Sequence, residues 1–363
     1  MMVLAAAGPG EVRVAATAAD GLHDVAIWRP GAPDGVGDLH RGRVIARMPA
    51  LAGAFVAIGG EDGFLPDSAG GERVTEGDVL AVRVTRAAQG GKGKRLAAAP
   101  ETAAGAGRPA LLARGPDAVQ RLAALHPAAP VLVDDAELAA RLRPALGARL
   151  RLVARAFDAA TEAAFAALAE PVSELPGGVR LGVWPTPGLT ALDLDLGPAA
   201  FGRAAKAAAH LALNRAALPA IARQIRLRNL AGAILLDFAG LSPRRRASLG
   251  PDLAAALAAD PLAPRLLGFT ALGLAEIVRP RIHPPLHEML AGPHAAGLDA
   301  LRHLAAESAA RPAVAFALTA APAVAEALRR DDGARADLAR RTGRPLRLRT
   351  DAALTPLGWQ VGE

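Results

Sequence analysis

Hydrophobic and polar residues alternate near the start of the chain. Alternation at Val12 and Val14 is followed by the turn pair Asp20-Gly21, and it resumes from Val25. Alternation with a period of two on both sides of an Asp-Gly turn is typical of a β-hairpin. We therefore expect a hairpin within the first forty residues.

A second β-rich stretch covers residues 38–96. Its short apolar runs are separated by Gly-rich turns, and they read GRVIARMPA, GAFVAIGGEDGFLP and EGDVLAVRV. Short strands with such turns predict a small barrel of the OB type. The residues that follow, 97–129, begin with a stretch rich in Ala, Gly and Pro and are expected to form a connector.

From Pro130 onward the pattern predicts a mixed α/β structure. The runs LTALDLD and AGAILLDF read as two strands, and an alanine-rich helical stretch from about residue 198 to 230 separates them. Strands joined by a crossover helix are usually parallel, so this pattern predicts a βαβ unit. From about residue 298 the pattern predicts a helix, a strand, further helices and a short strand at RPLRLRT.

Composition narrows the class of protein. The chain has 363 residues, of which 52% are hydrophobic and 21% charged, as in a globular protein of two or three domains. It has no cysteine, which excludes disulfides, cysteine nucleophiles and thiolate zinc sites. The uncharged stretches are too short to span a membrane, and the opening MMVLAAAG lacks a charged start. We expect a cytoplasmic protein without a membrane segment.

The charge balance indicates a class of partner. The formal net charge is +7, and only Lys92, Lys94 and Lys206 are lysines among the 42 basic residues. Arginine offers a planar fork for phosphate, although a GC-rich genome produces the same bias. Nucleic acid is therefore the first partner to consider.

Three aspartates are candidates for catalysis. Asp193 and Asp195 lie at the end of the first predicted strand, and Asp237 ends the second. The carboxyl ends of parallel strands meet at one edge of a sheet, where ligands bind in open α/β sheets. Carboxylates gathered there would suit Mg²⁺, or Mn²⁺. The alternative is that each aspartate caps the next helix or turn.

Two further groups of residues are candidates for binding nucleic acid. Arg223 and Arg226 share a face at the end of the predicted helix, where they form either a phosphate-binding rim or a solvated basic face. Phe55 and Phe64 lie in the predicted barrel, ahead of Lys92 and Lys94 in the loop QGGKGK. Aromatic rings beside basic loops stack bases and hold phosphates in OB folds, although both rings could instead fill the barrel core.

Several of these stretches resemble the bacterial ribonuclease E/G family. GRVIARMPALAGAFVAIGGEDGFLP with GGKGKRL resembles its RNA-binding OB module, and TPGLTALDLD resembles its first catalytic strand. IARQIRLRNLAGAILLDF resembles the helix, basic turn and second catalytic strand of the family, and LGFTALGLAEIVRPRIHPPL resembles the stretch that follows. The tail from Ala300 resembles its small C-terminal domain.

The resemblance implies an α/β multidomain fold. An RNase H-like subdomain would contain an inserted OB-fold β-barrel, and a nuclease-like βαβ catalytic subdomain and a small α/β C-terminal domain would follow. The expected boundaries are 1–37 plus 130–176 for the RNase H-like subdomain, 38–96 for the OB module, 97–129 for a connector with a reduced 5′-sensor region, 177–292 for the catalytic subdomain and 293–363 for the C-terminal domain.

The resemblance also implies a function. Asp193 and Asp237 would hold one Mg²⁺ that activates water against an RNA phosphodiester, and Phe55, Phe64 and Lys92 would contact the RNA. We therefore expect a Mg²⁺-dependent endoribonuclease for single-stranded RNA, in RNA processing or decay. The alternative is a non-catalytic RNA-binding protein of the same fold.

The chain departs from the family pattern at several places. Asp195 stands where the family has asparagine, and an ionised carboxylate can only accept hydrogen bonds. The family's loop is not recognisable in residues 196–210. The zinc-binding cysteines are absent, which excludes a zinc-linked tetramer and leaves another homodimer contact open. The Arg-Thr motif of the 5′-sensor is also absent, so preference for 5′-monophosphorylated RNA should be weak.

Overall fold

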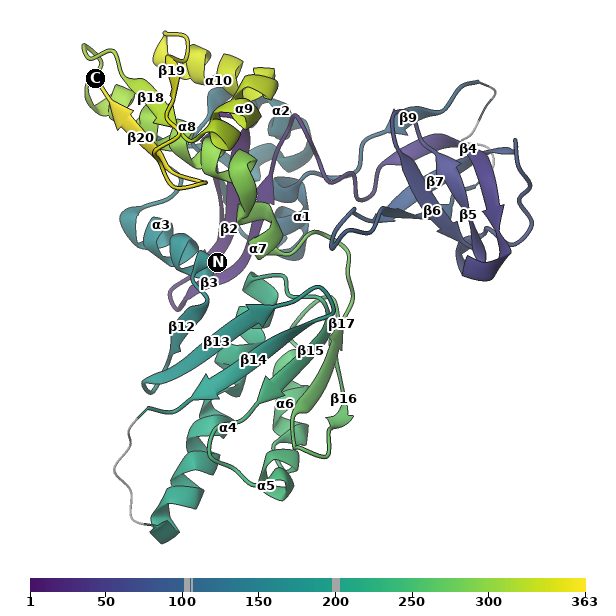
Figure 1. Ribbon diagram of the computed structural model, residues 1–363, viewed down its shortest axis with the longest axis vertical. Helices are drawn as coiled ribbons and strands as arrows, with labels where there is room; N and C mark the ends of the chain where they lie inside the picture. Colours follow the sequence, from purple (N-terminus) through teal and green to yellow (C-terminus); the bar gives the residue numbers. More distant parts are fainter. Residues whose placement is uncertain (101–104, 106, 198–202) are drawn as a thin grey trace. The chain divides into compact units, whose positions relative to one another are not determined.

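The computed structural model describes residues 1–100, 105, 107–197 and 203–363, with residues 203–207 described by their backbone alone. It is a mixed α/β structure, as predicted, and it divides into two compact units (Figure 1). The first unit comprises Met1–Asp38, Ala113–Glu162 and His287–Glu363, and the second comprises Leu39–Leu112 and Ala163–Leu286. Among the described residues, no helix combines the length and the hydropathy needed to cross a membrane.

A five-stranded sheet forms the centre of the first unit. Its spatial order is β11-β10-β1-β2-β3, with β1 to β3 antiparallel and β10 and β11 parallel to β1. The predicted hairpin is confirmed as β2 and β3, but β1 was not predicted because its apolar run lacks alternation. The strands are β1 (Met2–Gly8), β2 (Glu11–Ala18), β3 (Gly21–Trp28), β10 (Val131–Val133) and β11 (Leu150–Leu152).

Helices α1 (Ala118–Leu125) and α2 (Ala136–Leu146) contribute apolar side chains to the core of this sheet. Helix α1 falls within the predicted connector 97–129, so part of that segment is regular. The start of α1 is stabilised by a capping box between Asp117 and Gln120, in which each side chain accepts a hydrogen bond from the other residue's backbone N–H. Residues 101–104 and 106 of the connector lie outside the described residues.

The C-terminal part of the first unit is a small sheet with helices (Figure 1). It has the predicted helix, strand and helices, and a last strand that sequence patterning missed. It packs closely on the turn between β1 and β2, since a side chain at Gly10 would meet the methyl group of Ala334 at 2.5 Å. The elements are α7 (Leu286–Leu290), α8 (Gly292–Ala310), β18 (Ala317–Ala320), α9 (Pro322–Arg330), α10 (Asp332–Thr342), β19 (Leu348–Thr350) and β20 (Trp359–Gly362).

A closed five-stranded barrel of the OB-like type opens the second unit (Figure 1). The strands follow the order β5-β6-β8-β7-β4, pairing of β4 with β5 closes the barrel, and β9 adds to β4. Val44, Val56, Leu65 and Leu96 are among the residues that fill its core. The strands are β4 (Leu39–Met48), β5 (Gly53–Ala57), β6 (Asp62–Pro66), β7 (Val79–Arg86), β8 (Lys94–Ala98) and β9 (Ala110–Ala113).

The second unit also contains a six-stranded sheet of order β12-β13-β14-β15-β17-β16. Strands β14 and β15 are adjacent and parallel, which confirms the predicted βαβ unit. The crossover helix α4 buries Leu218, Ile221 and Ile225 against one face of the sheet, and the start of the predicted helix, 198–202, lies outside the described residues. The elements are α3 (Ala159–Ala166), β12 (Val172–Leu175), β13 (Val179–Pro185), β14 (Leu189–Asp195), α4 (Arg203–Leu227), β15 (Gly232–Asp237), α5 (Pro243–Ala247), α6 (Gly250–Leu257), β16 (Arg265–Phe269) and β17 (Ala275–Arg279).

Candidate active site and RNA interface

The two predicted metal-binding aspartates lie side by side at the ends of neighbouring strands. Asp193 of β14 is the direct register partner of Asp237 of β15. Neighbouring strands are about 4.8 Å apart, and paired residues point to the same face of a sheet. The sequence prediction that these two carboxylates meet at one edge therefore agrees with the strand register.

Both aspartates point away from helix α4. On β14, Leu192 and Leu194 are buried in the core beneath the helix, whereas Asp193 and Asp195, which alternate with them, are exposed. At the end of β15, Leu236 and Phe238 are buried in the same core, and Asp237 between them is partly exposed. We call this side of the sheet, which carries the side chains of β13, β14 and β15 that alternate with the buried ones, the open face. Carboxylates on such a face are accessible to a substrate and to a cation.

Asp237 has a cationic neighbour that the sequence analysis did not single out for this role. Arg246 Nη1 lies 2.5 Å from Asp237 Oδ1, and Arg246 Nε donates to the Leu241 carbonyl oxygen at 2.9 Å. Oδ1 itself is shielded from solvent and makes no hydrogen bond of good geometry, although 44% of the Asp237 side chain is exposed. Gly273, with φ +82°, lets this arginine pass close to the backbone, because a Cβ there would meet Arg246 Cδ at 3.0 Å.

The third candidate carboxylate, Asp195, is held by other groups. Its side chain accepts from Arg180, its register partner on β13, and from the backbone N–H of Gly197 at 2.9 Å. The Gly197 hydrogen bond, followed by the Arg180 hydrogen bond, lowers the pKa of Asp195 below its ordinary value. The negative charge that replaces the family's asparagine is therefore compensated locally.

The donor set at Asp193 and Asp237 fits a hard cation. Within the part of the chain that the structure describes, no three His, Asp or Glu residues converge closely enough to hold a metal ion. Mg²⁺ commonly takes only one or two protein carboxylates and completes its shell with water and substrate phosphates. Glu276 of β17 lies on the same face as Asp237, but it is the register partner of Leu235, two residues before the strand end.

The barrel brings the two predicted stacking residues together. Phe55 and Phe64 are register partners on β5 and β6, and their ring centroids are 5.5 Å apart in an edge-to-face arrangement. Phe55 is 37% exposed and Phe64 is half-buried, so neither ring belongs to the barrel core. The ring of Phe64 lies over Gly53, where a Cβ would meet it at 2.4 Å.

The two lysines of the Gly-rich loop differ. Lys92 is exposed at a tight turn in which Gln89 and Lys92 exchange backbone hydrogen bonds of 3.0 Å. Lys94 forms an ion pair with Glu61, and only 11% of its side chain is exposed. Lys92 is therefore free to meet a phosphate, whereas Lys94 is engaged within the barrel.

Two arginines beside the aromatic pair, Arg95 and Arg86, were missed by sequence reasoning. Arg95 is the register partner of both Phe64 and Arg86, and among the described residues neither arginine has a carboxylate partner. Arg86 donates to the Gly93 carbonyl oxygen at 2.9 Å, while its Nε is buried without a hydrogen bond. Burial, followed by repulsion from Arg95 and Arg281, lowers the pKa of Arg86. The run GKGKRL was the available signal for Arg95.

The barrel and the six-stranded sheet touch next to this cluster. The backbone N–H of Ala87 and the side chain of Gln89 both donate to the carbonyl oxygen of Ile282, at 2.8 and 3.3 Å. Arg281, the neighbour of Ile282, lies against Gly232 at the start of β15. Basic groups thus continue from the barrel to the start of β15, at the edge of the sheet opposite Asp237.

Arg223 and Arg226 lie away from the carboxylates. Helix α4 returns from the end of β14 to the start of β15, so its C-terminus lies at the opposite edge from Asp193 and Asp237. The length of β15 separates the two edges by about 17 Å. Arg226 donates to the Ala259 carbonyl oxygen at 3.0 Å, beyond the end of α6. The interpretation of these arginines as a rim beside the aspartates is therefore wrong for this topology.

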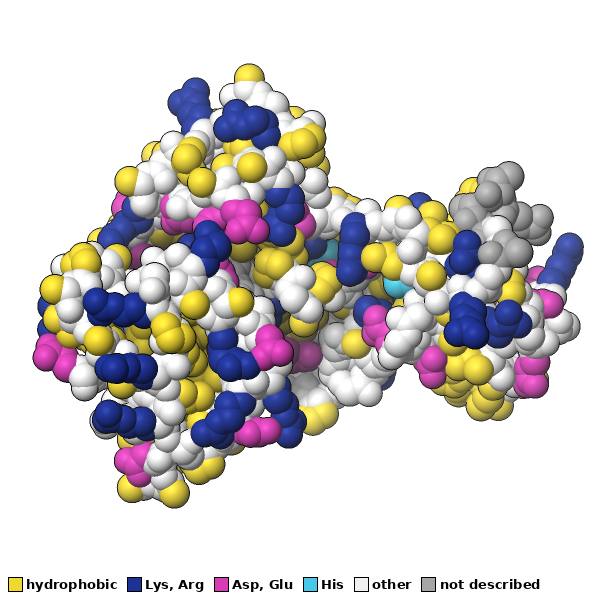
Figure 2. Space-filling model, turned by 90° about the horizontal axis from the view of Figure 1, so that it is seen from above, with side chains coloured by type: hydrophobic (Ala, Val, Ile, Leu, Met, Phe, Trp, Pro, Cys, Tyr) yellow, Lys and Arg dark blue, Asp and Glu magenta, His cyan; other side chains and the backbone are white. Residues whose placement is uncertain are grey.

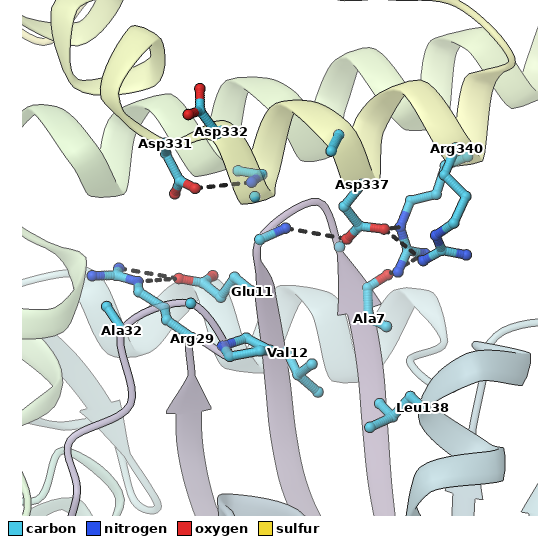
Figure 3. Close-up of a pocket in the computed structure, with 18 of the residues that line it drawn as sticks. Ala7, Glu11, Val12, Arg29, Ala32, Leu138, Asp331, Asp332, Asp337 and Arg340 are labelled. Atoms are coloured by element: carbon cyan, nitrogen blue, oxygen red, sulfur yellow. Dashed lines mark hydrogen bonds and ion pairs between the residues drawn. The ribbon is translucent and has the colours of Figure 1, made fainter. Parts of the chain in front are cut away.

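A separate cleft of about 910 Å³ lies in the first unit, between the β1–β2 turn, α2, α9 and α10 (Figure 3). Its charged groups pair with one another or with close neighbours. Glu11 meets Arg29 at 3.1 Å and Arg302 at 3.2 Å, and Asp135 meets Arg341 at 3.0 Å. None of the predicted site residues is among those that line it. These pairs join the C-terminal helices to the sheet.

Basic side chains occur across the face shown in Figure 2, where acidic and hydrophobic side chains separate them. The net charge of +7 is therefore not concentrated there in one continuous basic surface. The overall charge alone therefore does not locate a nucleic-acid site on this face.

The part of the chain that contains Asp193 and Asp237 is similar in sequence to known proteins. Residues 134–282 match the model of the Ribonuclease E/G family. Ribonuclease E of Nostoc sp. (strain PCC 7120) is 37% identical over 122 residues, which is 33% of this chain and 18% of that protein. Ribonuclease G of Escherichia coli K12 is 31% identical over 173 residues, 44% of this chain and 35% of that protein. Ribonuclease E of Synechocystis sp. is 31% identical over 125 residues, 34% of this chain and 18% of that protein.

These matches span about a third or less of each relative's own length. The residues matched to the family model include Asp193 and Asp237 with the strands that carry them, whereas Phe55 and Phe64 lie outside them. The shared segment thus coincides with the sheet and helix that bring the two carboxylates together. On these matches, residues 134–282 of the chain are similar to the Ribonuclease E/G family.

Proposed function

We propose that the chain is a Mg²⁺-dependent endoribonuclease for single-stranded RNA, with a role in RNA processing or decay. The observation that carries the proposal is the direct pairing of Asp193 with Asp237 at the ends of two parallel strands, on an open face. The relatives named as ribonucleases, whose family model matches this same segment, support it.

The residues around the pair have distinct roles in this proposal. Asp193 and Asp237 would supply carboxylate oxygens to Mg²⁺, or to Mn²⁺. The bound ion would polarise a phosphoryl oxygen and lower the pKa of a water molecule. Arg246 neutralises Asp237 when no cation is present, and its Nε–Leu241 bond keeps the guanidinium nearby, where it can donate to a phosphate oxygen.

The barrel would hold the RNA strand. Phe55 and Phe64 present adjoining partly exposed rings, which can stack only on bases that are not paired in a duplex. Arg95 lies in register beside Phe64, and Arg281 lies by the start of β15. Arg95 and Arg281 repel Arg86 and lack carboxylate partners among the described residues, so an RNA phosphate would relieve that repulsion. This arrangement favours single strands over duplexes.

One observation favours a second candidate, a non-catalytic RNA-binding protein of the same fold. The lowered pKa of Asp195 keeps its side chain an ionised carboxylate, which has no proton to donate to Asp193 as an asparagine could. The segment after it, which lacks the family's loop in sequence, lies partly outside the described residues. Under this alternative the barrel would bind RNA, and the open face would not catalyse RNA cleavage.

A cleavage assay separates the two candidates. Purified protein is incubated with an end-labelled single-stranded RNA and with its duplex, each in Mg²⁺ and in EDTA. We expect internal cuts in the single strand that EDTA prevents and few cuts in the duplex. Tight binding to the single strand without any cuts would select the non-catalytic candidate.

A further inference from the structure

Trp184 is an exposed tryptophan on the open face of the six-stranded sheet. Half of its surface is accessible to solvent, while its neighbour Val183 is buried in the core on the other face. The other two tryptophans have partners, since Arg141 stacks on Trp28 and the ring of His303 packs on Trp359. Within the described residues the indole of Trp184 has no hydrogen bond and no ring contact. Its exposure therefore has no explanation in the packing of the sheet.

The indole lies along β13, toward the edge of the sheet where Asp193 and Asp237 lie. A Cβ built on Gly182 would be only 2.8 Å from Trp184 Nε1, so the ring already fills the space over that glycine. Gly182 is the register partner of Asp193, and Cβ positions of paired residues are about 4.5–5.5 Å apart. The edge of the indole is thus next to the Asp193 side chain, and Asp237 follows on the next strand.

The charges nearby restrict what could cover this ring. The open face carries the carboxylates Asp193, Asp195 and Asp237, and the arginines paired with them are Arg180 and Arg246. Both arginines are paired with carboxylates, so Arg246 could meet a phosphate only once an added cation binds Asp237, whereas a flat, uncharged ring can stack on the indole directly. The ring also stays accessible to a ligand, because Ala191, the register partner of Trp184 on β14, is too small to cover it.

We propose that Trp184 is the stacking platform for one unpaired nucleobase of RNA, and that it places the adjoining phosphodiester at Asp193 and Asp237. The inference rests on the proposed function and deepens it by naming a base subsite at the reaction centre, separate from Phe55 and Phe64 on the barrel. Stacking tolerates every base, so this subsite orients the strand and adds at most a modest preference for bases that stack strongly.

Intrinsic fluorescence tests the proposal without any cleavage. The chain has three tryptophans and no tyrosine, so its emission reports tryptophan alone. A short single-stranded RNA is titrated in EDTA into the wild-type chain and into Trp184→Phe, Trp184→Ala and the matched control Trp359→Phe. We expect quenching in the wild type and the control. Trp184→Phe should lose most of the quenching and keep its affinity, and Trp184→Ala should bind roughly tenfold more weakly.

A second readout is kinetic. In Mg²⁺, Trp184→Ala should cut the same RNA with a raised KM and a lowered kcat, and Trp184→Phe should restore both, since only a flat ring is required. Melting temperatures of these variants should stay close to the wild type, because the side chain is exposed.

The outcomes distinguish this inference from the proposed function. Equal quenching, affinity and KM in Trp184→Ala and the wild type would overturn the inference even if the protein cuts RNA. Loss of self-association in Trp184→Ala, with RNA binding unchanged, would also overturn it and would assign the ring to an interface between copies. Quenching that depends on Trp184 in a chain that never cuts RNA would support the base subsite and contradict the endoribonuclease proposal.

Discussion

The open face of the six-stranded sheet and the cleft of the first unit both carry many charged side chains, but in different surroundings. In the cleft, Glu11 is 5% exposed and lies between Arg29 and Arg302. On the open face, Asp193 is exposed and Asp237 has a single arginine beside it. Charges that are buried and fully paired hold elements together, whereas accessible and incompletely paired charges remain available for a ligand.

The largest expected effect on stability is at Glu11. Glu11→Gln leaves two arginines beside a buried neutral amide, and removing one partner of a buried ion pair costs about 3–5 kcal/mol. The matched change on the open face, Asp237→Asn, should cost about 1 kcal/mol or less, because exposed pairs contribute little. Urea unfolding of both variants checks this contrast. Equal losses would mean that the two regions do not differ in the way described.

The second effect compares neighbours on strand β6. Leu65 is fully buried in the barrel core, and Leu65→Ala should destabilise the protein by about 2–5 kcal/mol. Phe64→Ala should cost less stability but weaken binding to single-stranded RNA by roughly tenfold or more, since a stacked base contributes about 1–3 kcal/mol. Thermal melting beside an RNA titration at fixed salt separates the two roles. A melting temperature that falls more for Phe64→Ala than for Leu65→Ala would assign Phe64 to the core.

A smaller effect is expected at Arg95, which repels Arg86 and has no carboxylate partner among the described residues. If it contacts an RNA phosphate, Arg95→Ala should lower the slope of log affinity against log salt concentration by about 0.7. Arg151→Ala, an exposed arginine on β11, is the control and should leave that slope unchanged. Affinity is measured at several salt concentrations. A slope unchanged in both variants would remove Arg95 from the RNA interface.

The smallest effect concerns Asp195, whose pKa is lowered by Gly197 and Arg180. A carboxyl group with a lowered pKa in the folded state stabilises the protein above its ordinary pKa of about 3.9 and loses that contribution as the pH falls through the folded-state value. Asp195→Asn should therefore melt slightly below the wild type at pH 7, and the two melting temperatures should converge in acid. A gap that persists at low pH would point to a cause other than this charge.

Sequence patterning could predict the features that depend on local periodicity. Strands β14 and β15 are apolar runs that end in aspartate, and the rule that crossover connections join parallel strands was enough to place Asp193 beside Asp237. Phe55 and Phe64 stood out as aromatics within short barrel strands, and their partial exposure agrees with that prediction.

Features that arise from tertiary approach could not be predicted in this way. Arg246 reaches Asp237 only because α5 folds back over the strand end, next to Gly273. Arg223 and Arg226 looked close to the carboxylates along the chain, but the direction of α4 carries them to the other edge. Trp184 reads as an ordinary strand residue until the strand register shows that Gly182, beneath its ring, faces Asp193.

The central claim is that Asp193 and Asp237 together carry RNA cleavage. The direct measurement is single-turnover cleavage of an end-labelled single-stranded RNA in Mg²⁺ by the wild type, Asp193→Asn and Asp237→Asn, with RNA affinity measured in parallel. We predict that each substitution abolishes cleavage while RNA affinity stays the same or rises slightly, because a negative charge facing the phosphates is removed. Cleavage at the wild-type rate in either variant would contradict the claim and would place the chemistry elsewhere in the chain.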